Sequence, residues 1–316
     1  MPFIYEQQVS GGSGGSGSSE SGSSGGSTVI VREINTQTTI QNGRHVPVNL
    51  KEKYTASKLL AEINKGAASE IYPGDYYPVT IGGTFHDYAT DTDKTLNNVS
   101  VRLEVAAIDP YLYYGDEGEF AAGAKHIVFT CHAALPLVLQ MRSANSTWFD
   151  KTTNNPWTGS ALYKTLNDTT NGLIRLFKQT EIGPYIYTGS DNAGMRHVME
   201  TKAVNVSSAS GMHWGNRGAL FFPTEKELWG SSMYSNNRFG SGGAVQQWPI
   251  FALAGDYTSK TLGEGSSPCN YWCESSVDNS STAFCRGAAR NFPYTGEAGT
   301  DNAGIVPCFI VCGRGE

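Results

Sequence analysis

Three stretches rich in β-branched and aromatic residues decide the fold: GDYYPVTI at 74–81, VSVRLEVAAI at 99–108 and KHIVFTC at 125–131. Turn-forming Gly, Asp or Asn residues lie close to each stretch, and apolar runs bounded in this way are typical of β-strands. Because other segments carry helix signals, the sequence predicts an α+β chain.

Three segments carry the start and stop signals of short helices. Residues 54–66 end at a glycine and place apolar residues on one face, and 159–167 is a second candidate. In PTEKELWG, Thr224 is the predicted N-cap and Glu227 the N3 residue of a capping box that ends at Gly230. Beyond Gly230 we predict no helix but a loop-rich final third, in which short apolar pieces alternate with Gly, Ser and Asn.

Residues 11–27, GGSGGSGSSESGSSGGS, consist of eight Gly, eight Ser and one Glu. Such a stretch buries too little apolar surface to offset its ordering entropy, so we predict a flexible linker with a reach of about 23 Å. It is either a native linker, which its irregular order favours, or a linker added for expression.

Residues 1–10 precede the linker and are too few to fold alone. They are either a frayed terminus or a docking peptide that becomes ordered on a partner. We favour the docking peptide, because a long linker with no functional segment at its end would serve no purpose. The apolar residues that would make the contact are Phe3, Ile4, Tyr5 and Val9.

Residues 28–72 are predicted to form a neck, with one strand and one short helix, between the linker and a head at 73–316. The sequence TVIVREINTQTTI at 28–40 is rich in β-branched residues, Gln and Thr. This composition favours a strand or an oligomer-forming segment. We expect a homo-oligomer, with a trimer as the working assumption.

Charge and hydropathy exclude several classes of protein. The net charge is −6, which argues against a nucleic-acid partner because phosphate binding needs a basic surface. No apolar run approaches the roughly 20 residues that span a bilayer, so no membrane insertion is expected. The N-terminus has neither the basic nor the apolar region of a signal peptide, so we expect a chain that is not exported.

Five of the six cysteines lie within the last 48 residues. The pairs Cys269/Cys273 and Cys308/Cys312 have a spacing of four, which on a strand separates the two thiols by about 13 Å. That distance is too long for a shared metal ion or a mutual disulfide. We expect reduced, buried thiols, with disulfides or a metal site as the alternatives.

The composition of residues 270–294 favours a binding surface. This segment combines stiff aromatic side chains with small polar ones, as recognition loops do, and residues 213–217 repeat the pattern. About half of the aromatic residues are expected to fill the core instead, first of all Trp248 and Trp272. The ligand-binding candidates are Trp214, Arg217, Tyr271, Glu274, Asp278, Asn279, Arg286, Arg290, Asn291 and Tyr294.

No catalytic motif is present: the sequence has no GxSxG, HExxH, P-loop or dinucleotide-binding glycine pattern. His126 lies within a predicted strand, where a packing role is expected. The sequence therefore predicts a protein that is not an enzyme, with no catalytic residues, no cofactor and no metal.

The segments GDYYPVTI, KHIVFTC, SALYKTLND, LFFPTEKELWG, NYWCESS, TAFCRGA and GIVPCFIVCG follow one another in this order. The series resembles a family of structural proteins of bacteriophages and prophages of gut bacteria, over about residues 73–313. In that family a PSE-x-E-x-x-G helix precedes a W-x-R-S strand and a closing G-x-R-P-x-F strand. The domain is similar to the C-type-lectin-like fold, in the branch of formylglycine-generating enzymes and of the variable proteins of diversity-generating retroelements.

The departures from the family pattern are informative. Glu274 and Val306 stand where the two strand motifs have Arg, which argues against an arginine-based polar core. The Cys308/Cys312 spacing differs from the copper-binding cysteine pair of the formylglycine-generating enzymes. The calcium-binding signatures of sugar-binding C-type lectins are not visible either.

The resemblance implies a virion display protein, made in the host cytoplasm, that is a head fibre, a decoration protein or a tail-tip protein. Its lectin-like head would bind a host-surface glycan or protein, and residues 1–10 would dock on a capsid or tail protein. The alternatives are a bacterial surface adhesin with the same fold and a copper-dependent oxidase of the formylglycine-generating type.

Overall fold

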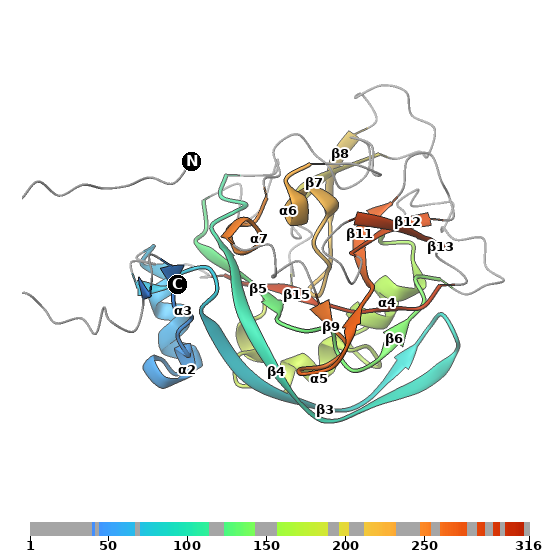
Figure 1. Cartoon of the computed structure of the whole chain (residues 1–316), viewed down its shortest axis with the longest axis horizontal. Coiled ribbons are helices and arrows are strands. Elements are labelled where there is room, and N and C mark those ends of the chain that lie inside the picture. Colours follow the sequence, from blue (N-terminus) through green and yellow to red (C-terminus); the bar gives the residue numbers. More distant parts are fainter. Residues whose placement is uncertain are drawn as a thin grey trace, which may run out of the picture. The chain divides into compact units, whose positions relative to one another are not determined.

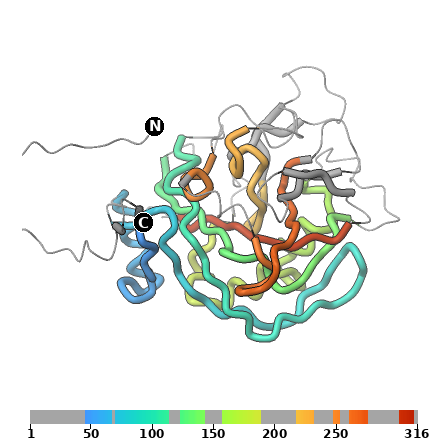
Figure 2. Tube along the Cα trace, in the orientation of Figure 1, coloured from blue at the N-terminus to red at the C-terminus, as the bar shows by residue number. Residues whose placement is uncertain are grey.

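The computed structural model shows an α+β fold built on two β-sheets (Figure 1). All the residues it describes belong to one compact unit, Gln37–Glu316. Figure 2 shows the Cα trace in the same orientation, coloured from blue at the N-terminus to red at the C-terminus. The structure describes residues 40–41, 44–66, 70–113, 123–142, 157–188, 196–201, 212–231, 247–253, 260–276, 283–287, 293–297 and 301–312.

The three predicted strands are confirmed and form one antiparallel sheet with a fourth strand from the end of the chain. The sheet order is β15-β5-β4-β3. The first two strands are longer than predicted, because β3 and β4 continue into a hairpin that curves along the lower side of Figure 1. The bounds are Tyr76–Asp87 for β3, Thr92–Ile108 for β4, His126–Cys131 for β5 and Cys308–Cys312 for β15.

Strand β15 lies deep in the molecule, and all five of its residues are buried. One edge pairs with β5. The other edge is covered by two separate segments: Phe221 exchanges backbone hydrogen bonds of 3.0 and 2.8 Å with Cys308, and Tyr187 N donates to Ile310 O at 2.8 Å. A strand covered along both edges is protected from pairing with other chains.

The second sheet has the order β13-β12-β11-β14-β6, and only the β11–β14 pair is parallel. Three two-stranded pairs complete the β-structure. The second sheet contains β6 (Val138–Leu139), β11 (Tyr271–Ser276), β12 (Ala283–Gly287), β13 (Pro293–Glu297) and β14 (Ala303–Gly304). The pairs are β1 (Ile40–Gln41) with β2 (Arg44–His45), β7 (Arg196–Thr201) with β8 (Met212–Asn216), and β9 (Lys260–Thr261) with β10 (Pro268–Cys269).

The helices are short, and the three predicted ones are confirmed as α3 (Ala56–Asn64), α4 (Ala161–Asn167) and α6 (Glu225–Trp229). The prediction that no helix follows Gly230 is wrong, because Pro249–Leu253 forms α7. Its proline stands at the first helical position, where the missing N–H costs no hydrogen bond. The remaining helical segments are α2 (Leu50–Lys53), α5 (Ile174–Lys178) and the 3₁₀ turn η2 (Gly183–Tyr185).

One hydrophobic core holds these elements together. Helix α3 packs on β15 and β5, while α4 and α5 pack on β3. Leu50, Leu59 and Ile63, which belong to the segment assigned to the neck, are buried in the same core as the strands of the head. The expectation that Trp248 and Trp272 lie in the core is confirmed, since they are 1% and 0% exposed.

A buried carboxylate fixes the segment that enters the core from the N-terminal side. Asp75 is 1% exposed and accepts hydrogen bonds from the backbone N–H groups of Val48 and Tyr72 at 2.8 and 2.9 Å. Its Oδ1 atom also lies 2.6 Å from His45 Nε2. These contacts join residues 45–48 to the start of β3 at a defined point.

The capping box of α6 gives a first testable prediction. Thr224 Oγ1 accepts from Glu227 N at 3.2 Å, and Glu227 Oε2 accepts from Thr224 N at 2.7 Å. Because Thr224→Ala leaves a buried N–H without its acceptor, we expect it to lower the free energy of unfolding by about 1 to 2 kcal/mol. Chemical denaturation measures the loss, and Thr224→Ser, which keeps the hydroxyl, should retain most of the stability. Equal losses in the two variants would contradict the capping role.

Candidate functional site

A buried arginine lies where three distant segments of the chain meet. Arg217, one residue after β8, is 0% exposed. Its Nη1 and Nη2 atoms donate to Glu227 Oε1 and Oε2 at 2.8 and 3.0 Å, a bidentate pair, and its Nε donates to Glu274 Oε2. Nη2 also donates to the backbone oxygen of Phe222. The expectation against an arginine-based polar core is therefore wrong for this chain, although the arginine comes from a position outside the strand motifs.

A tyrosine and a histidine extend this cluster toward the first sheet. The Tyr111 hydroxyl donates to Glu227 Oε1 at 2.7 Å, and the Tyr111 ring stacks on His126 with 5.7 Å between ring centroids. Burial and the nearby charge of Glu227 raise the pKa of Tyr111, so its hydroxyl keeps its proton. The pKa of Arg217 is raised although burial disfavours its charge, because Glu227 and Glu274 outweigh that cost.

Helix α6 positions the cluster because Glu227 has two roles. One carboxylate caps the helix through Thr224 N and also binds the Arg217 guanidinium. The start of the helix is tied to β11, since Ser275 Oγ accepts from Glu225 N at 3.0 Å and Pro223 O accepts from Glu274 N at 3.2 Å. Helix α6 and β11 are thereby held in one arrangement from which the predicted recognition segments extend.

The structure places three of the predicted ligand-binding residues inside the molecule. Arg217 and Tyr271 are 0% exposed and Glu274 is 5% exposed, so their side chains serve the interior instead of offering a surface to a ligand. The sequence shows that these residues are polar or aromatic but not that they face inward, and both faces of β11 turn out to be covered.

The strand register brings other candidates together. Arg286 in β12 lies directly opposite Trp272 in β11 on one side and opposite Tyr294 in β13 on the other. Trp214 lies in β8, opposite Met199 of β7. The backbone of these strands is described, and the other candidates lie outside the described residues: Asp278, Asn279, Arg290 and Asn291, and with them the docking residues Phe3, Ile4, Tyr5 and Val9.

Cys308 and Cys312 are not placed to act together as a pair of thiolates. Cys308 and Cys312 are the two ends of β15, where strand geometry separates them by about 13 Å. Burial raises the pKa of Cys308 to about 12, so its thiol stays protonated, and it donates to Thr130 Oγ1 at 3.3 Å. Cys131 and Cys269 are likewise free thiols. This geometry does not suit two cysteines that bind one copper ion.

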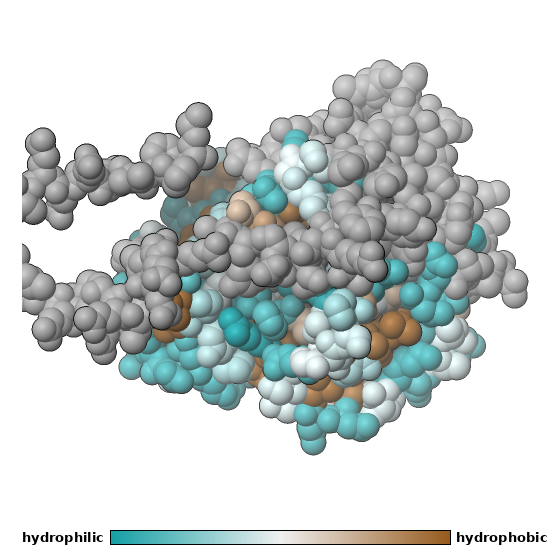
Figure 3. All heavy atoms as spheres, viewed as in Figure 1, coloured by the Kyte–Doolittle hydropathy of each residue, from teal (hydrophilic) through white to brown (hydrophobic). Residues whose placement is uncertain are grey.

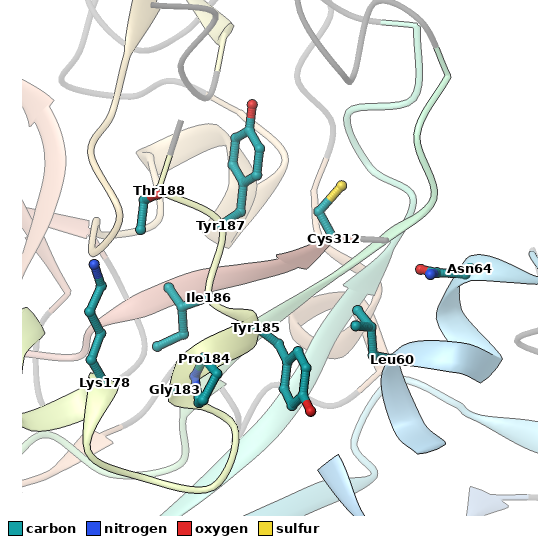
Figure 4. Close-up of a pocket in the computed structure, with 10 residues that line it drawn as sticks. All are labelled: Leu60, Asn64, Lys178, Gly183, Pro184, Tyr185, Ile186, Tyr187, Thr188 and Cys312. Atoms are coloured by element: carbon teal, nitrogen blue, oxygen red, sulfur yellow. The ribbon is translucent and has the colours of Figure 1, made fainter. Parts of the chain in front are cut away.

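A pocket of about 580 Å³ lies between α3, the turn η2 and the end of β15 (Figure 4). Leu60 and Asn64 reach it from the helix, and Lys178 and Cys312 contribute side chains from the other elements. Among the described residues that line it there is no carboxylate and no imidazole.

The surface seen in Figure 3 is mixed, with hydrophilic residues between small separate hydrophobic areas. Within the described parts of the chain, no group of three or more His, Cys, Asp or Glu side chains is arranged to hold a metal ion. None of the helices in those parts has the length and hydropathy needed to cross a bilayer.

Comparison of the chain with family models, with curated proteins and with solved structures finds no match.

Proposed function

We propose that this chain is a bacteriophage virion display protein whose C-type-lectin-like head binds a glycan or a protein on the host surface. The supporting sequence feature is the ordered series of motifs that resembles phage and prophage structural proteins. The supporting fold feature is the α+β arrangement, in which short helices accompany two sheets.

The observation that carries the proposal is the buried cluster of Arg217, Glu227 and Glu274. It locks β11 and α6 to the segment after β8, and the recognition-type segments adjoin these same elements. Binding residues are commonly carried by loops on a rigid scaffold, because a fixed base lowers the entropy cost of ordering them. A charged cluster at the base of such loops suits a binding head.

The N-terminal segment supports display on a particle. Residues 1–10 carry Phe3, Ile4, Tyr5 and Val9 ahead of the Gly/Ser linker at 11–27. A short apolar peptide on a flexible tether fits a docking peptide for a capsid or tail protein. Several copies on one particle, or a homo-oligomer such as a trimer, would raise the avidity of weak individual contacts.

The proposal assigns no catalytic role to the chain. A copper-dependent oxidase needs two thiolates that reach one metal ion, and the positions of Cys308 and Cys312 at opposite ends of β15 do not provide them. Measurement of copper in the purified protein tests this part. One bound copper per chain that is lost in Cys308→Ser would favour the oxidase.

The display function is tested on particles and on the purified full chain. When residues 1–10 are deleted from the chain, the assembled particles should no longer contain this protein. Particles that still contain a full complement of the shortened chain would contradict docking.

Binding of the full chain to host cells should fall at least tenfold in Arg290→Ala and Tyr294→Ala, because recognition residues of these types dominate binding energy. The exposed substitution Lys58→Ala, on α3, is the matched control. Display of the protein on the producing cell, without particles, would favour the adhesin.

A further inference from the structure

A second groove, made from other elements than the recognition segments, lies along the β3–β4 hairpin and helix α5. Its volume is about 410 Å³, within the range of small-ligand sites. The hairpin lies at the bottom of Figure 1, whereas β11, β12 and β13 lie toward the top. The lining residues are Thr84, Phe85, His86, Tyr88, Asp93, Asn171 and Arg175.

Hydrogen bonds cross-link the two walls of this groove. His86 N donates to Asn171 O at 2.8 Å, and an Arg175 guanidinium nitrogen donates to Thr84 O. The Tyr88 N–H donates to Thr165 Oγ1 at 3.0 Å, and the Tyr88 hydroxyl donates to Asp168. The edge of β3 is thus joined directly to residues 165–175. Such a groove is formed before a ligand arrives, which lowers the cost of binding.

The segment behind the groove is itself held by a single carboxylate. Asp168 Oδ1 accepts from Thr170 N and Asn171 N at 2.8 and 3.1 Å. The hydrogen bond from the Tyr88 hydroxyl lowers the pKa of Asp168 most, and these two backbone hydrogen bonds lower it further. The carboxylate therefore stays charged. The Asn171 side chain is therefore presented at the groove from a turn with fixed hydrogen bonds.

The charges around the groove are balanced. Of the residues that line the groove, Asp93 is acidic, Arg175 is basic, and His86 is basic when protonated. The His86 ring nitrogens lie 3.0 Å from Asp93 Oδ1 and 3.1 Å from Asp91 Oδ1. A strongly charged ligand needs an excess of one sign, and this groove has none.

The chemistry of the lining fits hydroxyl groups. A sugar hydroxyl both donates and accepts, and the groove offers an acceptor at Asp93, donors at Arg175, and an amide with both functions at Asn171. Tyr88 adds an aromatic ring, with Lys164 Nζ 4.0 Å from the ring centroid. Sites of this kind combine an apolar wall with a few convergent polar groups.

We infer that the groove between the β3–β4 hairpin and α5 binds a neutral saccharide, as a second glycan site separate from the recognition segments. The inference goes beyond the proposed function and does not depend on it, because none of its residues belongs to the segments at 213–217 or 270–294.

The test uses the purified full chain with a panel of neutral oligosaccharides (lactose, maltotriose, cellotriose and N-acetylchitotriose) and with sialyllactose as an anionic counterpart. Binding is detected by saturation-transfer NMR and quantified by calorimetry. At least one neutral sugar is expected to bind, and to bind more tightly than sialyllactose. Binding of no neutral sugar, or tighter binding of the anionic one, would overturn the inference.

Matched variants locate the binding. Asp93→Asn and Asp91→Asn each remove one negative charge beside His86, but only Asp93 lines the groove. We expect Asp93→Asn and Asn171→Ala to raise the Kd at least tenfold, and Asp91→Asn to change it less than about twofold. Thermal unfolding checks that each variant is folded. An unchanged Kd in folded Asp93→Asn and Asn171→Ala would place the sugar elsewhere and refute the site.

Two further variants separate this inference from the proposed function. Arg290→Ala and Tyr294→Ala should leave oligosaccharide binding in the groove unchanged while host-cell binding falls. A loss of oligosaccharide binding in these two variants would assign the sugar to the recognition segments and overturn the inference.

Discussion

Replacing Arg217 by Met is expected to lower the free energy of unfolding by about 3 to 5 kcal/mol. The substitution keeps much of the side-chain volume but leaves the carboxylates of Glu227 and Glu274 buried without their cation. An unpaired buried charge costs far more than an exposed one, because the interior cannot replace its hydration. Chemical denaturation monitored by tryptophan fluorescence measures the loss.

Two controls distinguish loss of the ion pair from a general effect of the substitution. Lys58→Met changes a cation to Met at an exposed position of α3 and should alter stability by no more than about 0.5 kcal/mol. In the double variant Arg217→Met/Glu274→Gln one buried charge is removed as well, so the combined loss should be smaller than the sum of the single losses. Additive losses would show that the two side chains act independently.

The stability of the protein is expected to fall by about 3 kcal/mol as the pH drops from 6.5 to 4, because of His126. The neutral ring suits its site: Nδ1 donates to Ala124 O at 2.9 Å, and Nε2 accepts from Tyr111 N at 3.1 Å. Burial lowers the pKa of His126 to about 4. In the unfolded chain the ring takes up a proton near pH 6.5, so acid favours unfolding through this group.

The sign of the effect is tested with the variant His126→Gln. His126→Gln removes the titrating ring, so its stability should fall less steeply between pH 7 and pH 4.5, whatever its stability at neutral pH. His86 should show the opposite sign, because its hydrogen bond to Asp93 raises its pKa and its stabilising contribution is lost as the pH rises. An unchanged slope in His126→Gln would show that other groups cause the acid sensitivity.

Local signals in the sequence were sufficient for the elements with strong local chemistry. The capping box at Thr224 and Glu227 predicted the start of α6 and Gly230 predicted its end, since the caps depend only on neighbouring residues. The three long strands were predicted from β-branched runs. Helix α7 was not predicted, because its five residues, Pro249–Leu253, are too few to show a helical period. The helix is stabilised by packing on β4, which the local sequence does not indicate.

The interior site was beyond what the sequence could predict. Tyr111, the stretch with Arg217 and Glu227, and Glu274 are far apart in the sequence, and no spacing along the chain indicates that they meet. Arg217 and Glu274 were read as surface residues because their polar character outweighed any sign of burial. The capping box was the one feature of the sequence that pointed to the cluster. It placed Glu227 near the start of α6, with its second carboxylate oxygen free to bind another partner.

The position of β15 has a consequence for how the chain is made. Cys308 of β15 lies beside Thr130 of β5, 178 residues earlier. On the ribosome, a nascent chain that has not yet released residues 308–312 leaves the outer edge of β5 open and the backbone of Phe221 without its partner. The first sheet is therefore completed only after residues 308–312 have emerged, and a long-range pairing of this kind is slow. Until then the open edge can pair with other chains, so protein yield should depend on chaperones and on expression rate.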